Sequence, residues 1–166
     1  FVRPTLSGEK IAALAITEPG TGSDVAGVKT RAVLDGDHYV VTGSKMFITS
    51  GTRADFLTTL VRTDDDPHGG LSFLIIEPSM EGVSVSRSIK KTGWRASDTA
   101  ELAFDEVRVP VANLIGSEGA AFIMLMDNFQ TERLALSAYG AATAEIAYEE
   151  ARKYAKDRHA FGRPIM

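Results

Sequence analysis

Residues 16–24, which read Ile-Thr-Glu-Pro-Gly-Thr-Gly-Ser-Asp, are the stretch around which the chain is organised. They follow a short apolar run at residues 11–16 that has the length and composition of a buried strand. The proline and the two glycines stop any regular element, and the glycines permit positive φ and close approach of a ligand. Hydroxyl groups and free amides on such a turn can bind an anion or the edge of a polar ring. A plain strand-to-strand connection is the alternative, and this loop alone favours it.

Composition limits the class of protein. The 166 residues suffice for one domain, or for a small domain with part of another. The absence of cysteine excludes disulfides, thiolate metal sites and a cysteine nucleophile, and no metal site is predicted. The formal net charge of −4 argues against a nucleic-acid partner, and no apolar run reaches the roughly 18 residues of a membrane span. The chain starts without a methionine and stops just after a helical pattern, so we expect a piece of a longer, intracellular protein.

Short strand-like runs follow the loop at a spacing of about ten residues. They lie at residues 28–34, 38–42, 45–50, 56–61 and 71–76, from residue 83 onward, and at residues 100–109. Asp35-Gly36 reads as a two-residue hairpin turn, and the alternation slips at Asp105-Glu106, where we expect a bulge or bend. With no helical period between them, these runs predict an antiparallel β-barrel or sandwich over residues 1–115.

The pattern changes to that of a helix between residues 118 and 158. This segment lacks proline, and its apolar side chains recur three and four residues apart. Ser117 is predicted to be the N-cap. Such a helix would extend about 60 Å, so either it bends or breaks near Gly140 or it belongs to a bundle that is truncated here. The sequence therefore predicts an α+β fold, with residues 116–166 forming the start of a helical domain.

Phe47 and Thr49 are the first pair of residues that could carry chemistry. They are two residues apart and would share one face of a strand. A flat ligand stacked on Phe47 could receive a hydrogen bond from Thr49 or its amide. A core phenylalanine beside a strand threonine is the simpler interpretation, and the local pattern alone favours it.

Glu132, within the predicted helix, is a candidate general base. The residues three and four positions away include Phe129, Ala135 and Leu136, so its carboxylate would emerge on a mostly apolar face. A poorly hydrated carboxylate is a better proton acceptor, which suits the role of a general base. A surface glutamate, or one paired with a basic residue of a missing helix, fits the spacing equally well.

Residues 157–162, Asp-Arg-His-Ala-Phe-Gly, end the predicted helix with two basic groups and a capping glycine, Gly162. Arg158 could bind a phosphate, because its guanidinium matches that geometry. Basic residues are also common at helix C-termini, where they complement the dipole, and this simpler interpretation is favoured by the segment alone.

Four motifs, taken together in order and spacing, carry a resemblance to a known family. Besides residues 16–24 and 157–162, they are Lys-Met-Phe-Ile-Thr-Ser-Gly at 45–51, and Gly-Trp-Arg-Ala-Ser-Asp-Thr at 93–99 with Val-Arg-Val-Pro at 107–110. The chain resembles the acyl-CoA dehydrogenases from about residue 12 onward. This resemblance implies the middle β-domain and the first helix of the C-terminal domain. It also implies FAD-dependent α,β-dehydrogenation of an acyl-CoA thioester to the trans-2-enoyl-CoA, with the hydride passing to flavin N5.

The resemblance also assigns site residues. Thr17 would lie near the pyrimidine side of the flavin, Phe47 takes the place of a common tryptophan against the ring, and Thr49 would bond near N5. Arg158 would reach the FAD of a neighbouring subunit, where Ala160 replaces a common threonine. The full set of implied FAD-binding residues is Leu14, Ala15, Ile16, Thr17, Ser23, Phe47, Ile48, Thr49, Arg158 and Phe161.

The substrate and the base are assigned in the same way. Ser23, Gln130 and Arg133 would contact the acyl-CoA, and Gln130 stands where a well-studied branch of the family has aspartate. Glu132 matches the base of the isovaleryl and long-chain branches. The alternative is that the base lies in a later C-terminal segment, outside this chain. A local basic cluster is formed by Arg87, Lys90, Lys91 and Arg95. The favoured interpretation is a solvated loop, and the alternatives are that the cluster binds CoA phosphates or a partner flavoprotein.

Partners and location follow from the resemblance as expectations. They are an acyl-CoA substrate, an electron-transferring flavoprotein as acceptor, and a homo-oligomer, either a tetramer or a dimer. The compartment would be the bacterial cytoplasm, or the mitochondrial matrix in a eukaryote. An acyl-CoA oxidase that uses oxygen and a non-catalytic flavin-binding or assembly module on the same fold remain as alternatives. Residues 1–166 alone are expected to be inactive and to retain little FAD.

Overall fold

The computed structural model describes all residues, 1–166. The chain forms two compact units, Phe1–Met124 and Leu125–Met166. The first unit holds the sheet and the start of the long helix; the second holds the rest of that helix and a short hairpin. None of the helices combines the length and the apolar character that a membrane crossing requires.

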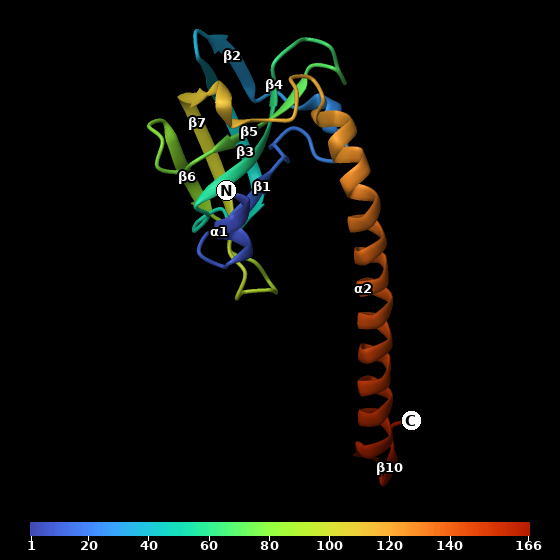
Figure 1. Cartoon of the computed structure of the whole chain (residues 1–166). Helices are drawn as coiled ribbons and strands as arrows, with labels where there is room; N and C mark the ends of the chain where they lie inside the picture. The colour runs from blue at the N-terminus through green and yellow to red at the C-terminus, as the bar shows by residue number, and fades with distance from the viewer. The chain divides into compact units, whose positions relative to one another are not determined.

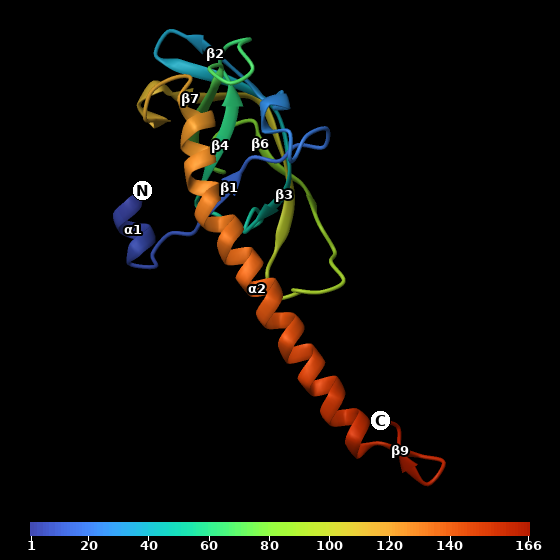
Figure 2. The ribbon, with the colours of Figure 1, turned by 90° about the vertical axis from the view of Figure 1, so that its right-hand side faces the viewer.

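The first unit is built on one eight-stranded sheet (Figure 1). Its order is β6-β7-β3-β2-β4-β5-β8, and β1 pairs with β4 (Figure 2). All neighbouring strands are antiparallel except β1–β4 and a single contact between β2 and β4, which are parallel. The strands are β1 Ala12–Ala15, β2 Arg31–Asp35, β3 His38–Thr49, β4 Phe56–Arg62, β5 Leu71–Ile76, β6 Val83–Ser88, β7 Thr99–Pro110 and β8 Leu114–Ile115.

The mostly antiparallel sheet followed by one long helix confirms the predicted fold class. Two details of the prediction were wrong. The runs at 38–42 and 45–50 form one continuous strand, β3, rather than two strands. The β2–β3 hairpin turns one residue later than predicted, because Asp35 pairs with His38 and leaves Gly36 and Asp37 as the loop; Gly36 has φ 63°.

The predicted bulge in β7 is confirmed. Val41 faces Val107 and Gly43 faces Phe104, so both Asp105 and Glu106 lie opposite Thr42 alone. Glu106 has φ 50°, in the left-handed region, and its amide points to Thr42 Oγ1 at 3.3 Å. An extra residue of this kind bends the strand and increases its local twist.

The hydrophobic core of the first unit is a cluster of buried side chains from the strands of the sheet. The strands β1 to β5 and β7 contribute buried side chains, of which β2 supplies only Ala32, whereas β6 is largely exposed at the sheet edge. Full burial of one aliphatic side chain contributes about 1.5–3 kcal/mol, so this cluster is the main source of stability. Its members include Ala13, Ala15, Ala32, Tyr39, Val41, Ile48, Leu57, Val61, Leu74, Ile76, Leu102, Phe104, Val107 and Val109.

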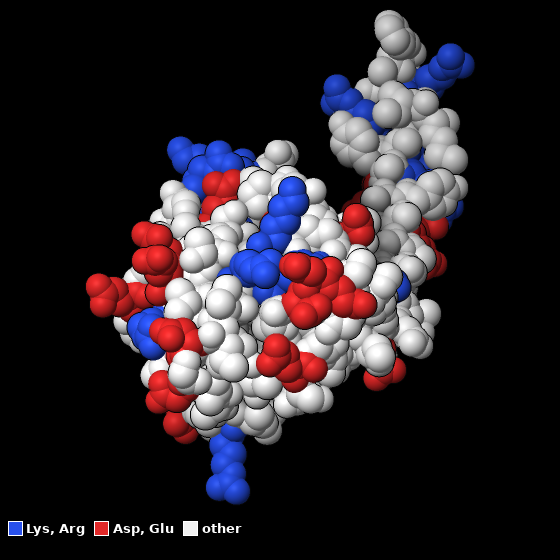
Figure 3. All heavy atoms as spheres, turned by 90° about the horizontal axis from the view of Figure 1, so that it is seen from above, with Lys and Arg blue, Asp and Glu red and all other residues white.

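Short elements complete the first unit. They are helix α1 Val2–Leu6 and the 3-10 turns η1 Val25–Gly27 and η2 Val111–Asn113, none of which the sequence predicted. Phe1 packs its ring 5.0 Å from that of Phe56. On the face seen in Figure 3, acidic and basic side chains are interspersed rather than gathered into one basic surface.

The long helix, α2 Ala121–Asp157, begins later than predicted. Ser117 is therefore not its N-cap; its carbonyl accepts the amide of Ala120 in a turn that precedes the helix. In the same turn Glu118 accepts a hydrogen bond of 2.8 Å from the Tyr39 hydroxyl, and Gly119 donates to Ser72 Oγ at 2.9 Å. Burial and then the Glu118 carboxylate raise the pKa of Tyr39 to about 12. These contacts fix the end of the sheet to the start of the helix.

The helix runs through Gly140 without a break. Of the two explanations offered for its length, a break at that glycine is therefore wrong. Much of its apolar surface is exposed, as expected for a helix that lacks bundle partners. The exposed side chains include Leu134, Leu136, Tyr139, Ile146, Tyr148 and Tyr154.

Candidate flavin and acyl-CoA site

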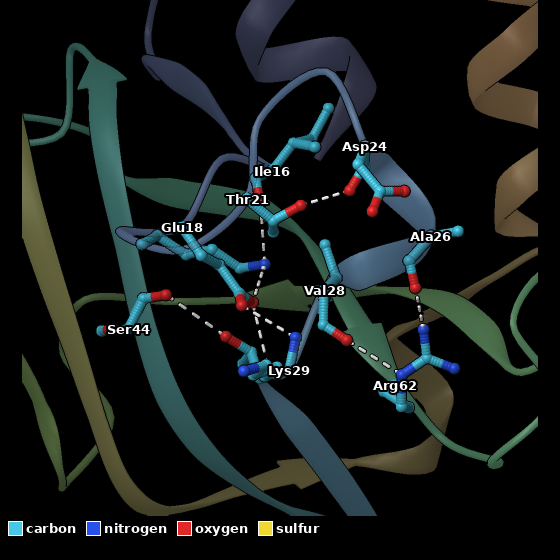
Figure 4. A network of polar contacts seen from close by, with 11 residues as sticks. Ile16, Glu18, Thr21, Asp24, Ala26, Val28, Lys29, Ser44 and Arg62 are labelled. Carbon is cyan, nitrogen blue, oxygen red and sulfur yellow. Dashed lines mark hydrogen bonds and ion pairs between the residues drawn. The ribbon is translucent and has the colours of Figure 1, made fainter.

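The loop at residues 16–24 is anchored by the buried carboxylate of Glu18 (Figure 4). Its Oε2 accepts the Lys29 amide at 2.7 Å, and its Oε1 accepts the Thr30 amide at 2.9 Å. The same Oε1 lies 2.9 Å from Nζ of Lys45 in an ion pair. Because one side chain binds the lead-in to β2 and a residue of β3, it ties the loop to the sheet at two places.

Lys45 is the buried partner of that carboxylate, with none of its side chain exposed. Its Nζ also donates to the carbonyl oxygen of Ile16 at 3.0 Å. Burial lowers the pKa of Lys45 to about 8, although the negative charge of Glu18 opposes the shift. Burial by itself would raise the pKa of Glu18, but Lys45 and the hydrogen bonds from Thr30 and Lys29 outweigh it and lower that pKa.

Sequence reasoning missed this pair, although a signal was present. Lys45 continues the inward register of β3 that Tyr39 and Val41 begin, so the alternation places a lysine where the strand is buried. A lysine at such a position requires a carboxylate partner. Glu18, in the glycine-rich loop, was the available candidate.

The turn itself uses some of the amides that we expected to be free. Glu18 and Thr21 exchange two backbone hydrogen bonds of 2.9 and 3.2 Å, and the Thr21 hydroxyl donates to the carbonyl of Asp24. Only part of the predicted donor set therefore remains. The amides of Gly22 and Ser23 have no hydrogen-bond partner within the chain, and both residues are exposed.

A second segment of the candidate site is a bulge in β3, beside the loop. The Met46 amide donates to the carbonyl of Thr17 at 2.8 Å, which places the two segments next to each other. The pairing with β7 shifts between Lys45 and Ile48, and Phe47 within that shift has φ 61°. Left-handed backbone in a bulky residue costs about 1–3 kcal/mol and is concentrated at functional sites.

The bulge turns the Phe47 ring to the surface. Phe47 is 59% exposed, whereas Ile48 is buried, so the core-phenylalanine interpretation was wrong. Thr49 is exposed again, which agrees with the prediction that Phe47 and Thr49 share a face. Leu14, on β1, is 41% exposed, and Ala15 and Ile16 are buried.

These features fit a flat ligand with polar edges. An exposed aromatic ring held in strained backbone offers a stacking surface, and a hydroxyl and unpaired amides lie on the same two segments. The first unit thus brings together the predicted FAD-binding residues of the N-terminal half, namely Leu14, Ala15, Ile16, Thr17, Ser23, Phe47, Ile48 and Thr49.

The remaining predicted site residues belong to the second unit. Glu132 is exposed on α2, and Nδ2 of Asn128 donates to its Oε1 at 2.7 Å. The poor hydration that we expected from its apolar neighbours is therefore not found in this chain. The Arg133 guanidinium carbon lies 5.6 Å from the centroid of the Phe129 ring, and Gln130 is exposed.

The chain ends in a small hairpin rather than in a capped helix. Strands β9 His159–Ala160 and β10 Arg163–Pro164 are joined by Phe161 and Gly162, with φ 54° and 77°. Positive φ at both loop residues is the mark of a type I′ turn. Gly162 is therefore a hairpin residue and not a helix cap. Phe161, at the tip, is fully exposed, and Arg158 is exposed at its base.

The basic cluster of the β6–β7 loop lines a pocket of about 580 Å³. Lys90, Lys91 and Arg95 of this loop lie in its wall. Arg53, from the connection between β3 and β4, also lines the pocket, but it is paired with Asp98 at 2.9 Å. Arg87, which was grouped with these residues, instead pairs with Glu101 at 2.7 Å and does not line the pocket.

Comparison with known proteins identifies the family. The middle-domain model of acyl-CoA dehydrogenase matches residues 13–107, and the C-terminal-domain model matches residues 117–166. The short-chain specific acyl-CoA dehydrogenase of Clostridium acetobutylicum is 43% identical over 99% of this chain and 44% of its own length. The mitochondrial long-chain specific acyl-CoA dehydrogenase of Sus scrofa is 39% identical over 99% of this chain and 39% of its own length.

Solved structures agree with this match. An acyl-CoA dehydrogenase from Geobacillus kaustophilus has a TM-score of 0.93 and 42% identity, covering 99% of this chain and 44% of that one. The chain thus belongs to the acyl-CoA dehydrogenase family. It spans less than half the length of the relatives that it matches.

Proposed function

We propose that residues 1–166 act within a longer acyl-CoA dehydrogenase that converts an acyl-CoA thioester to the trans-2-enoyl-CoA. The observation that carries this proposal is the strained bulge of β3, which presents Phe47 beside the glycine-rich loop. Family membership supplies the chemistry that such a stacking surface serves.

FAD is the proposed cofactor, and its support is the fit of the first unit to a flat, polar-edged ring. Phe47 would stack on the ring, while Thr17 and Thr49 would hydrogen-bond its edges. Arg158 and Phe161 would serve the cofactor of a neighbouring subunit. When bound, FAD supplies a two-electron acceptor for the hydride that leaves the β-carbon. One similar structure, from Bacillus anthracis, is named as complexed with FAD.

Glu132 is the proposed base. Its carboxylate would accept the proton from the α-carbon, while the carbon–hydrogen electron pair becomes part of the new double bond. Gln130 and Arg133, on the same turn of α2, would hold the thioester end of the substrate, and Ser23 would contact its pantetheine arm. The exposure of Glu132 in the isolated chain means that other parts of the protein must desolvate it.

The acceptor and the assembly belong to the same proposal. An electron-transferring flavoprotein is the proposed acceptor; a structure named for that protein in Acidaminococcus fermentans is 38% identical to this chain. The exposed apolar side chains of α2 support a homo-oligomer, a tetramer or a dimer, in the full-length protein. Bacterial and mitochondrial relatives support the bacterial cytoplasm or the mitochondrial matrix as the compartment.

Flavin binding by the full-length parent is the test of this proposal. We expect the purified protein to contain FAD, and Phe47→Ala to weaken its affinity by about tenfold, because the stacking contact between the Phe47 ring and the flavin is lost. Phe47→Trp should retain the affinity. Phe73→Leu, a change within the core of β5, is the control for a general loss of stability. Flavin affinity that is unchanged in Phe47→Ala would contradict the proposed site.

A further inference from the structure

We propose that Glu18 and Lys45 are a positioning pair for the cofactor, whose opposite charges hold residues 16–17 and 46–49 in their binding arrangement. The proposal rests on the proposed function, because it assumes that these two segments face FAD. It assigns a task to two side chains that do not themselves reach the surface.

The contacts of the pair connect both segments. Nζ of Lys45 binds the carbonyl of Ile16 at 3.0 Å and the carboxylate of Glu18 at 2.9 Å. One residue further along each segment, the carbonyl of Thr17 accepts the amide of Met46 at 2.8 Å. The register between the loop and β3 is thus set by three hydrogen bonds, two of which depend on the Lys45 ammonium.

Phe47 depends on the same anchor. Its left-handed backbone lies between Lys45 and Ile48, which are both buried. A strained residue persists only where its surroundings hold it on both sides. Lys45 is the anchor on the N-terminal side of the bulge, so a change at Lys45 reaches the Phe47 ring through one intervening residue.

The charge of Lys45 is accessible to titration. Burial lowers its pKa to about 8, and Glu18 is the one charged group that acts on it. Of the basic residues nearby, Lys29 contributes its backbone amide to Glu18, and Arg62 binds the carbonyls of Val28 and Ala26 (Figure 4). Loss of the proton would leave neutral, weaker hydrogen bonds and a buried carboxylate without its cation.

The experiment is a titration of FAD into the flavin-free full-length parent, followed by quenching of flavin fluorescence, from about pH 6.5 to about pH 9.5. We expect the Kd for FAD to rise about tenfold through a single transition near pH 8, the size expected for loss of one charge-assisted hydrogen bond. Lys45→Met should bind more weakly at neutral pH and lack the transition. Lys29→Met, the same substitution at an exposed side chain, should keep it.

Glu18→Gln separates a positioning role from general stability. The amide keeps an acceptor for the Thr30 N–H but removes the charge that favours protonated Lys45, so the transition should move to lower pH. A wild-type Kd that is constant with pH, a transition that survives in Lys45→Met, or an unmoved midpoint in Glu18→Gln would overturn the positioning pair. Absence of FAD binding at every pH would instead overturn the proposed function, and the pair with it.

Discussion

A lysine with no exposed surface is uncommon, and Lys45 is buried because β3 carries it inward beside the loop that supplies Glu18. Removing a charge from water costs several kcal/mol. That cost is offset only when the ion pair, the hydrogen bond from Lys45 to the Ile16 carbonyl and the two backbone amides that bind Glu18 are all present. The pair is therefore worth more as a constraint on the loop than as a source of net stability.

Lys45→Met should destabilise the chain at neutral pH by about 3–5 kcal/mol, because it leaves Glu18 buried without a cation. Combining it with Glu18→Gln should restore much of the loss, since neither charge then remains. Urea unfolding followed by circular dichroism measures both. Equal stability of the single and double variants would contradict an ion pair that is coupled in this way.

The same lysine predicts a pH dependence of defined sign. Its folded pKa, about 8, lies below its ordinary value of 10.5, so the unfolded chain binds more protons between these values. The contribution of Lys45 to the free energy of unfolding therefore increases with pH across that window, by at most about 1.4 kcal/mol per pH unit. Unfolding curves at several alkaline pH values should show a smaller increase for Lys45→Met than for the wild type. Parallel curves would show that Lys45 does not titrate there.

At the scale of elements, the two bulges of the sheet decide where side chains point. The bulge at Asp105-Glu106 shifts the register of β7 against β3, and the one at Phe47 brings an aromatic ring out of β3. Gly82, directly before β6, accommodates the first of these bulges. It has φ 88°, and its carbonyl accepts the Asp105 amide at 3.0 Å.

Gly82→Ala should therefore cost more than an ordinary glycine substitution. A Cβ at residue 82 would lie 2.2 Å from the Asp105 carbonyl oxygen, so the backbone must shift in addition to adopting a left-handed conformation. We expect a loss of about 2–5 kcal/mol. Gly36→Ala is the matched control, because φ is 63° but nothing lies within 4 Å of the added Cβ, and it should cost only about 1–2 kcal/mol. Urea midpoints that are equal for the two variants would contradict this account of the bulge.

Alternation of apolar residues predicted most strands and the β7 bulge, because burial on one face is a local property of each segment. It did not predict that β1 lies parallel to β4, or that Lys45 finds Glu18, since both depend on which segments meet in space. Phe47 illustrates the same limit. An aromatic side chain among apolar neighbours on a strand is expected in the core, and only the register shift in β3 brings the Phe47 ring to the surface. The candidate site residues, by contrast, come from the motifs through the family resemblance and stay a prediction.

At the scale of the whole molecule, the predicted site residues are divided between the two units. The first unit holds the residues around Thr17 and Phe47, and the second holds Glu132 and Arg158. The apolar side chains exposed along α2 are those of a helix made to pack against others. We therefore expect a complete site only in the longer protein that we propose.

The most direct test mixes the full-length parent anaerobically with a panel of straight and branched acyl-CoAs and follows the loss of flavin absorbance. We expect bleaching with one substrate class, and its loss in Glu132→Gln but not in Glu145→Gln, a matched change at an exposed position on the same helix. The isolated 166-residue chain, as a further control, should show no bleaching. Bleaching that survives Glu132→Gln would contradict the assignment of the base, and no bleaching with any thioester would contradict the proposed dehydrogenation itself.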